Sequence, residues 1–217
     1  MNNLNAWGEF YNKKITLGDF LGILYSHSLL FDELCKEEPE SILEVGVGSG
    51  SMGLFLSHLG YRVTAVDNNK TLLDKARGLN KGYNGNVNYL YADAFNLEGA
   101  FKQNTFDIVF SQGFFEHFSD TQICQLARQQ LKVGKKIIFS VPSRYYPVRD
   151  FGNERLLGIE HWRRILQDFD IELIKYYGFF LLNRREVLKF LINPFYFLKF
   201  LFSSLVKESS HILVKLK

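Results

Sequence analysis

Short apolar runs alternate with helical stretches along most of this 217-residue chain, and this alternation constrains the fold more than any other feature. Strands that alternate with helices of 10–15 residues form βαβ units, so the chain predicts an α/β fold whose mostly parallel sheet is covered on both faces. Apolar residues at helical spacing over 17–37 add one or two helices ahead of the first strand. The predicted strands are 41–47, 62–67, 87–93, 106–113, 135–143 and 171–180, and the predicted helices between them are 51–60, 70–82, 120–132 and 160–169.

Composition places the chain among ordinary globular proteins, with 47% hydrophobic and 23% charged residues. The two cysteines, Cys35 and Cys124, do not make a disulfide framework and indicate reduced thiols. No Cys/His pair has the spacing of metal ligands, so we expect no metal. The N-terminus has no basic segment followed by an apolar one, so we expect a cytoplasmic protein rather than a secreted one.

Residues 42–53, "ILEVGVGSGSMG", place a glycine-rich loop directly after the first predicted strand. Such loops let the backbone approach a ligand closely and aim amide N–H groups at it from a helix N-terminus. Two spacings overlap here. Gly48-x-Gly50-x-x-Gly53, followed by Asp67, is typical of dinucleotide binding. Gly46-x-Gly48-x-Gly50 is the alternative.

Two acids favour the alternative spacing. Glu44 lies inside the strand, where a nearby pyrophosphate would repel a carboxylate and a positively charged cofactor would not. Asp93 ends the third predicted strand, where its carboxylate can accept a hydrogen bond from an exocyclic amine such as that of adenine. Gly46, Asp67, Asp93 and Gln112 all lie at carboxyl ends of predicted strands, which is where parallel sheets bind ligands.

At these residues the sequence resembles the class I methyltransferases that depend on S-adenosylmethionine. The matching motifs are "LEVGVGSG" (43–50), "VTAVDNN" (63–69), "ADAF" (92–95), "FDIVFSQGFFEHF" (106–118) and "LKVGKKIIFSVPS" (131–143). In the last motif Val133 and Lys135 replace the family's Pro and Gly, which affects a turn and not a ligand. The resemblance implies a Rossmann-like, seven-stranded, mostly parallel sheet with an antiparallel final strand. It also implies S-adenosylmethionine as cofactor and a small-molecule acceptor, with oxygen ahead of nitrogen as the methylated atom.

The resemblance assigns the cofactor contacts as well. Asp67 would bind both ribose hydroxyls, and Asp93 would hold the adenine amine with the Ala94 amide facing the ring. The glycine loop would lie against the amino-acid end of the cofactor, and Gly53 would be a close-packing position in the following helix. The expected cofactor-binding residues are Glu44, Gly46, Val47, Gly48, Gly50, Asp67, Asn68, Asp93, Ala94, Gln112, Gly113 and Tyr11.

Candidates for catalysis and acceptor binding follow the fourth and fifth strands. His117 and His161 are candidate general bases, because histidine titrates near neutrality, although a packing role is the alternative for each. We expect Glu116 to be a solvated charge. The loop 143–158 leaves the carboxyl end of a strand and should border the acceptor pocket, unless it is an ordinary surface loop. Its candidate contacts for a carboxylate, phosphate or ring are Arg144, Tyr145, Tyr146 and Arg149.

We expect one methyltransferase domain over 1–217: an N-terminal helical lid at 1–37, a core at 38–180, an aromatic insertion at 181–210 and a final strand at 211–217. In the lid, Trp7 or Tyr11 would close the site. The segment 186–207 mixes Phe and Leu with basic residues, which interrupt it too often for a transmembrane helix. It predicts a pocket wall, a homodimer surface or a membrane-surface contact. Its basic residues form no stripe, so we expect no nucleic-acid partner.

Three other functions stay open at this stage. One is an RNA or protein methyltransferase, although "SQGF" (111–114) stands where amino-directed nucleic-acid enzymes carry an N-P-P-Y-type signature. A second is a non-catalytic protein that binds S-adenosylmethionine. The third is an NAD-dependent oxidoreductase, which the spacing Gly48-x-Gly50-x-x-Gly53 would suit.

Overall fold

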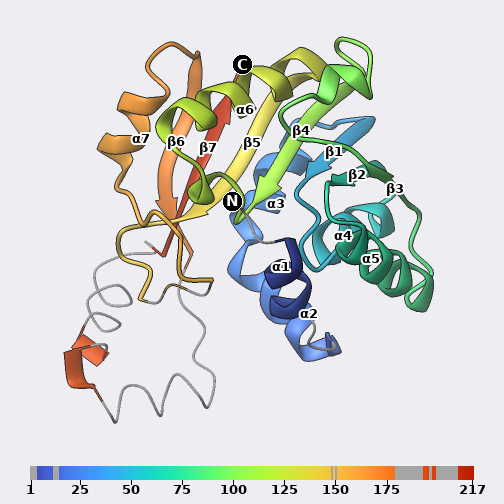
Figure 1. Ribbon diagram of the computed structural model, residues 1–217, viewed down its shortest axis with the longest axis horizontal. Helices are drawn as coiled ribbons and strands as arrows, with labels where there is room; N and C mark the ends of the chain where they lie inside the picture. The colour runs from blue at the N-terminus through green and yellow to red at the C-terminus, as the bar shows by residue number, and fades with distance from the viewer. Residues whose placement is uncertain are drawn as a thin grey trace.

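A computed structural model of the chain describes residues 4–11, 15–147, 149, 151–178, 193–195, 197–198 and 210–217. A seven-stranded sheet forms the centre of the molecule (Figure 1). Its strands are β1 (Ser41–Val45), β2 (Arg62–Asp67), β3 (Val87–Tyr91), β4 (Phe106–Gln112), β5 (Gly134–Pro142), β6 (Ile171–Tyr177) and β7 (His211–Leu216). The helices are α1 (Leu4–Phe10), α2 (Leu17–Ser26), α3 (Ser28–Lys36), α4 (Ser51–His58), α5 (Lys70–Gly82), α6 (Asp120–Val133) and α7 (Ile159–Ile165), with short 3₁₀ turns η1 (Leu97–Gly99) and η2 (Phe115–His117).

The strand order is β3-β2-β1-β4-β5-β7-β6. Neighbours from β3 to β5 pair in parallel, whereas β7 pairs antiparallel with both β5 and β6. The seven-stranded, mostly parallel sheet with an antiparallel final strand is therefore confirmed. The direction of winding changes between β1 and β4, which makes the carboxyl ends of these two strands the topological switch point of the sheet.

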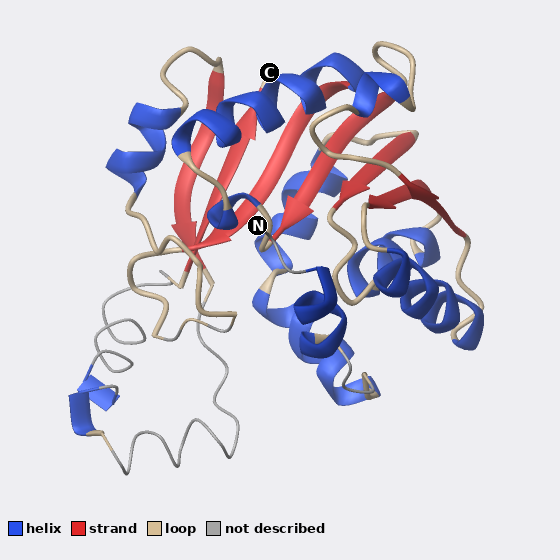
Figure 2. Cartoon of the chain, in the orientation of Figure 1, coloured by secondary structure: helices blue, strands red, loops and turns tan. Residues whose placement is uncertain are grey.

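Alternation of side chains along the strands gives each face of the sheet its own apolar core. On β5, Ile138 joins a cluster that includes Leu34 of α3, on the face covered by α3, α4 and α5. Phe139, the next residue, joins Leu126 of α6 and Trp162 of α7 on the opposite face. Figure 2 shows α6 crossing that second face, so helices cover both sides of the sheet as expected.

Local signals place the helices that border the site. The side chain of Asn69 accepts hydrogen bonds from the N–H groups of Thr71 and Leu72, so α5 begins directly after β2. The predicted helical stretch 17–37 divides at His27 into α2 and α3. In Figures 1 and 2, α1 lies beyond the arrowheads of β1 and β4, at the edge where the parallel strands end.

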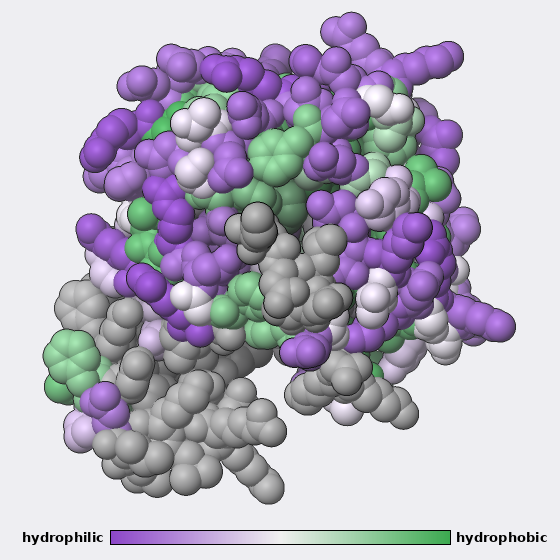
Figure 3. Space-filling model, in the orientation of Figure 1, coloured by the Kyte–Doolittle hydropathy of each residue, from purple (hydrophilic) through white to green (hydrophobic). Residues whose placement is uncertain are grey.

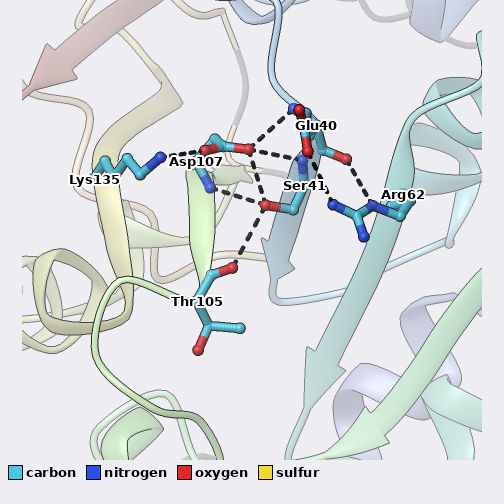
Figure 4. Close-up of polar contacts among 6 residues, drawn as sticks. All are labelled: Glu40, Ser41, Arg62, Thr105, Asp107 and Lys135. Atoms are coloured by element: carbon cyan, nitrogen blue, oxygen red, sulfur yellow. Dashed lines mark hydrogen bonds and ion pairs between the residues drawn. The ribbon is translucent and has the colours of Figure 1, made fainter.

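The amino-terminal edge of the sheet carries a polar cluster around Asp107 (Figure 4). Its Oδ2 accepts hydrogen bonds of 3.0 Å from the N–H groups of Glu40 and Ser41 and from the Ser41 hydroxyl. The Nζ of Lys135 lies 2.7 Å from the other oxygen, Oδ1. Lys135 first, and then these donors, hold the pKa of Asp107 down to about 2. The cluster ties the starts of β1, β4 and β5 together, and Lys135, which departs from the family pattern, supplies its cation.

The expected aromatic insertion lies almost entirely outside the described residues, and so do its expected roles as pocket wall, homodimer surface or membrane contact. Within 186–207, the side chains of Phe195, Phe197 and Leu198 are described, and all three are exposed. Among the helices of the described segments, none is long and apolar enough to cross a membrane. On the face seen in Figure 3, hydrophilic residues cover most of the outer surface.

Candidate cofactor and acceptor site

A cavity opens at the carboxyl ends of β1, β2, β3 and β4, at the switch point of the sheet. Each of these strands, or the loop that follows it, contributes to the wall. The α1 segment contributes Trp7 and Tyr11 from the other side. The sequence-predicted residues that line the cavity are Gly46, Gly48, Asp67, Asn68, Asp93, Ala94, Gln112, Gly113 and Tyr11.

The loop after β1 needs glycine for two reasons. Gly46 and Gly48 have φ of +80° and +51°, which other residues rarely adopt. A Cβ on Gly46 would lie 2.6 Å from the ring of Phe114, and one on Gly48 would lie 3.0 Å from the hydroxyl of Tyr11. Glycine at these two positions therefore lets the aromatic side chains of Phe114 and Tyr11 pack directly against the loop backbone.

Asp67 ends β2 with its carboxylate fixed between two loops. Its Oδ2 accepts from the N–H of Val47 at 3.1 Å, and its Oδ1 accepts from the N–H of Asn69 at 2.8 Å. Burial raises the pKa of Asp67, and the backbone donors oppose that rise. Val47 thus reaches the site through its backbone, because its buried side chain does not line the cavity.

Asp93 follows β3 at the other side of the cavity and is exposed. Its Oδ1 accepts from the N–H of Phe95 at 2.9 Å, which fixes the orientation of the carboxylate. Ribose hydroxyls and an adenine amine are hydrogen-bond donors, so carboxylates at Asp67 and Asp93 suit them as acceptors. The apolar wall between, which includes Ala94, suits an aromatic base. The chemistry of these residues therefore fits S-adenosylmethionine.

Glu44 does not line the cavity, contrary to expectation. It points toward α4, where a Cβ on Gly53 would lie 2.5 Å from its Oε2, so Gly53 is confirmed as a close-packing position. Burial raises the pKa of Glu44 to about 8, and the charge of Asp67 adds to the rise. The carboxyl is therefore neutral near pH 7 and presents no charge to a cofactor. Gly50 likewise lies outside the lining and packs against Ala76.

A second chamber adjoins the first. The two share a wall made of Trp7, Tyr11, Gln112, Gly113 and His117. The second chamber is completed by Phe10, Glu116, Pro142, Tyr146, Phe151, Glu154 and His211. A ligand in the first cavity would therefore meet a ligand in the second at the end of β4 and the η2 turn.

His117 stands in the shared wall. Its Nδ1 lies 2.6 Å from the side-chain oxygen of Asn153, which can only accept, so Nδ1 carries the proton. Nε2 lies 3.7 Å from Oε1 of Glu116. Burial lowers the pKa of His117, and the contact with Asn153 opposes that shift. The ring is therefore neutral near pH 7.

The expectation that Glu116 is a solvated charge is wrong. Its side chain is 2% exposed, and within the described part of the chain its Oε2 has no hydrogen-bond partner. Burial raises its pKa to about 8, and the nearby charge of Glu154 adds to the rise. Glu154 itself accepts hydrogen bonds from the N–H groups of Phe151 and Gly152. The available signal was the aromatic context of "FFEHF" (114–118), which indicates a buried segment.

Other predicted residues lie away from both chambers. His161, on α7, lines neither and has its Nε2 4.0 Å from Asp120. Arg144 is exposed and lies over the ring of Tyr145, 4.9 Å from its centroid, and neither residue lines a chamber.

Arg149 is exposed and lies outside both linings, so Tyr146 alone of the four predicted acceptor contacts reaches the second chamber. The Arg144 N–H donates to the Leu157 carbonyl, which pairs the two arms of the loop. The far arm of this paired loop brings Phe151 and Glu154 to the chamber instead.

Sequence comparison matches residues 42–136 to a family model described as a methyltransferase domain. Over 129 residues the chain is 31% identical to phosphoethanolamine N-methyltransferase 1 of Zea mays and to phosphoethanolamine N-methyltransferase 3 of Arabidopsis thaliana. The aligned part covers 58% of this chain, and 25% and 26% of those proteins. The chain therefore spans about a quarter of the length of these curated relatives.

Solved structures share the fold. Magnesium protoporphyrin IX methyltransferase from Synechocystis PCC 6803, solved with bound S-adenosylhomocysteine, aligns with a TM-score of 0.63 at 12% identity, over 98% of this chain and 92% of that one. An S-adenosylmethionine-dependent methyltransferase from Archaeoglobus fulgidus aligns with a TM-score of 0.58 at 15% identity, over 88% and 94%. The fold and the strand-end site agree with the match of residues 42–136 to a methyltransferase domain, and the chain resembles the S-adenosylmethionine-dependent methyltransferases.

Proposed function

We propose that this chain transfers a methyl group from S-adenosylmethionine to a small molecule held in the second chamber. The observation that carries the proposal is the shared wall of the two chambers. One chamber suits the cofactor, and the other meets it at His117 and the end of β4. When bound, the cofactor supplies a methyl group that is already activated by a positively charged sulfur.

The residues of the first cavity would orient the cofactor. Asp67 would accept hydrogen bonds from the ribose hydroxyls, and Asp93 would accept one from the adenine amine. Gly46 and Gly48 line this cavity, and the amino-acid end would lie beside them. Such positioning is the main contribution a protein makes to in-line transfer, because it replaces a chance encounter with a fixed geometry.

Two aromatic residues would exclude water from the reacting centre. The indole of Trp7, in α1, stacks on Phe151 with ring centroids 3.8 Å apart and an interplanar angle of 4°. Both residues line the second chamber, and Trp7 lines the first as well. The stack joins the N-terminal helix to the loop after β5 across the chambers, which supports the expected role of this segment as a lid.

His117 would take a proton from the acceptor. Its Nδ1 is engaged with Asn153, so Nε2 would be the ring atom that accepts this proton. The lowered pKa keeps the ring neutral, and therefore able to accept, at physiological pH. His161 lies outside both chambers, so we assign it no role in the reaction.

For the methylated atom, the proposal places nitrogen ahead of oxygen, which reverses the order expected from sequence alone. The curated relatives are named as N-methyltransferases, and this supports nitrogen. The acidic lining of the second chamber supports it too, because glutamates attract a basic amine.

Calorimetric titration with S-adenosylhomocysteine and with NAD tests the proposal, followed by transfer from labelled S-adenosylmethionine to a pool of small amines and hydroxyl compounds. We expect binding of S-adenosylhomocysteine, no binding of NAD, and label in an amine. Binding of NAD alone would contradict the proposal in favour of an oxidoreductase. Binding of S-adenosylhomocysteine without transfer to any compound would favour a non-catalytic binding protein.

A further inference from the structure

The second chamber combines acidic side chains with aromatic walls. Glu116 and Glu154 line it and are 2% and 7% exposed. Trp7, Tyr146 and Phe151 are among its aromatic residues. Within the described lining there is no lysine or arginine. Carboxylates attract a cation through charge, and aromatic faces attract it through their quadrupole, so both components of the wall favour the same kind of ligand.

The two glutamates differ in how their oxygens are satisfied. Glu154 accepts hydrogen bonds from two backbone N–H groups of its own loop. Glu116 is fully buried, and among the described residues nothing pairs with its Oε2. An unpaired buried carboxyl oxygen destabilises the folded state. Because Glu116 is a residue of the chamber wall, a turn of its side chain toward the chamber would give this oxygen a donor on a bound ligand as its partner.

We propose that the second chamber selects acceptors that carry an ammonium group, which pairs with Glu116 and packs against the aromatic side chains around it. This inference rests on the proposed function, because it names the class of acceptor that the same site would take. Primary, secondary and tertiary amines are protonated near pH 7 and belong to this class. Their methylated products are cations of the same shape and would bind there as well.

Binding of such a cation should change the protonation state of Glu116. Burial raises the pKa of Glu116 to about 8, so its carboxyl is protonated near pH 7 in the free protein. An ammonium group beside it favours the ionised form, so binding releases one proton to solvent. Affinity for the cation should therefore rise with pH and level off above about 8. The other titratable or charged groups around Glu116 are Glu154 and Arg155 of the loop after β5, His211 of β7, Tyr146 and Tyr11.

The test uses two probes of the same shape and different charge. Choline carries a quaternary nitrogen, and 3,3-dimethylbutan-1-ol has carbon in its place. Each is titrated calorimetrically into the full chain saturated with S-adenosylhomocysteine, in two buffers of different ionisation enthalpy. We expect choline to bind at least about tenfold more tightly than the alcohol. The buffer dependence of the enthalpy should correspond to release of about one proton at pH 7.

Glu116→Gln keeps the size of the side chain and removes its ability to ionise. We expect this variant to bind choline at least about tenfold more weakly and to release no proton, while S-adenosylhomocysteine binds within about twofold of the unsubstituted protein. Glu160→Gln is the matched control, because Glu160 is an exposed glutamate of α7 outside both chambers. It should change none of these quantities. Retained binding of S-adenosylhomocysteine shows in each case that the variant is folded.

The inference and the proposed function fail in different ways. Equal affinity for the two probes, no binding of choline or tetramethylammonium at millimolar concentration, or choline affinity unchanged in Glu116→Gln would each overturn the ammonium site. All of these can occur while S-adenosylhomocysteine still binds and methyl transfer still proceeds. Loss of S-adenosylhomocysteine binding in the unsubstituted chain would overturn the proposed function instead.

Discussion

The pKa values of carboxylates at the two edges of the sheet are shifted in opposite directions. At the amino-terminal edge, Asp107 is surrounded by backbone and hydroxyl donors and by the Lys135 ammonium, which hold its pKa down to about 2. At the carboxyl-terminal edge, burial raises the pKa of Asp67 and Glu116, which line the two chambers. The first arrangement stabilises the fold. The second reduces stability and leaves carboxylates ready for a ligand, which is typical of functional sites.

The largest expected effect is a loss of cofactor affinity at the carboxyl-terminal edge of the sheet. Asp67→Ala removes the carboxylate proposed to bind the ribose and also its contacts with Val47 and Asn69. We expect affinity for S-adenosylhomocysteine to fall about 100-fold, or about 3 kcal/mol, since two hydrogen bonds to a charged group are lost. Titration calorimetry measures this directly. Unchanged affinity would refute the ribose role, and circular dichroism confirms that the variant is folded.

The two candidate bases form a matched pair within the same chain. His117→Gln should lower methyl transfer about 100-fold while leaving S-adenosylhomocysteine affinity within about threefold, because general-base assistance is lost and binding is not. His161→Gln should leave the turnover within about twofold, since this residue lies on α7 outside both chambers. The measurement is turnover with the best amine of the labelled panel. Equal loss in both variants would exclude a specific role for His117.

At the amino-terminal edge of the sheet, Asp107→Ala should lower the free energy of unfolding by about 2 kcal/mol at pH 7 and leave S-adenosylhomocysteine affinity unchanged. The folded-state pKa of about 2 lies below the unfolded value, so the contribution of Asp107 is present above about pH 4. It is lost as pH falls toward 2. Urea unfolding at several pH values should show the variant and the unsubstituted protein converging in acid, and a constant difference down to pH 2 would count against this account.

The last expected effect is a change in how protein stability depends on pH. The pKa of Glu44 is raised to about 8, so its contribution to stability is fully present below its unfolded pKa of about 4.3 and is lost as pH rises through 8. Glu44→Gln removes this titration. Between pH 5 and 8 we expect the variant to gain up to about 3 kcal/mol relative to the unsubstituted protein in urea unfolding, since linkage amounts to about 1.4 kcal/mol for each pH unit between the two pKa values. Parallel pH profiles would show that Glu44 is ionised in the folded protein.

Local patterns predicted the strands and helices well, because periodicity and helix caps act within a few residues. Asp67 and Asp93 were found for the same reason, since each directly follows a buried strand at the edge where a parallel sheet binds ligands. The antiparallel final strand came from family resemblance, and its position between β5 and β6 was not predicted, because nothing in a short apolar run states which strands will flank it.

The acceptor side was predicted poorly, because it depends on contacts between distant segments. Glu116 is buried where the segment containing Phe151 and Glu154 comes to lie beside η2. Arg144 points away because its backbone pairs with Leu157 thirteen residues later. Neither contact can be predicted from the composition of the loop. Its arginines stand next to tyrosines, as they do in many binding surfaces.

Because Trp7 stacks on Phe151 in the chamber wall, its intrinsic fluorescence can report on the site. The sequence holds two tryptophans, and the other, Trp162, is fully buried on α7 among the side chains that face α6. A ligand in either chamber would lie close to the indole of Trp7, whereas Trp162 lines neither chamber. The intrinsic fluorescence of the protein therefore combines one emitter in the chamber wall with one in the core, and a shift in emission on mixing would report ligand binding without any added dye.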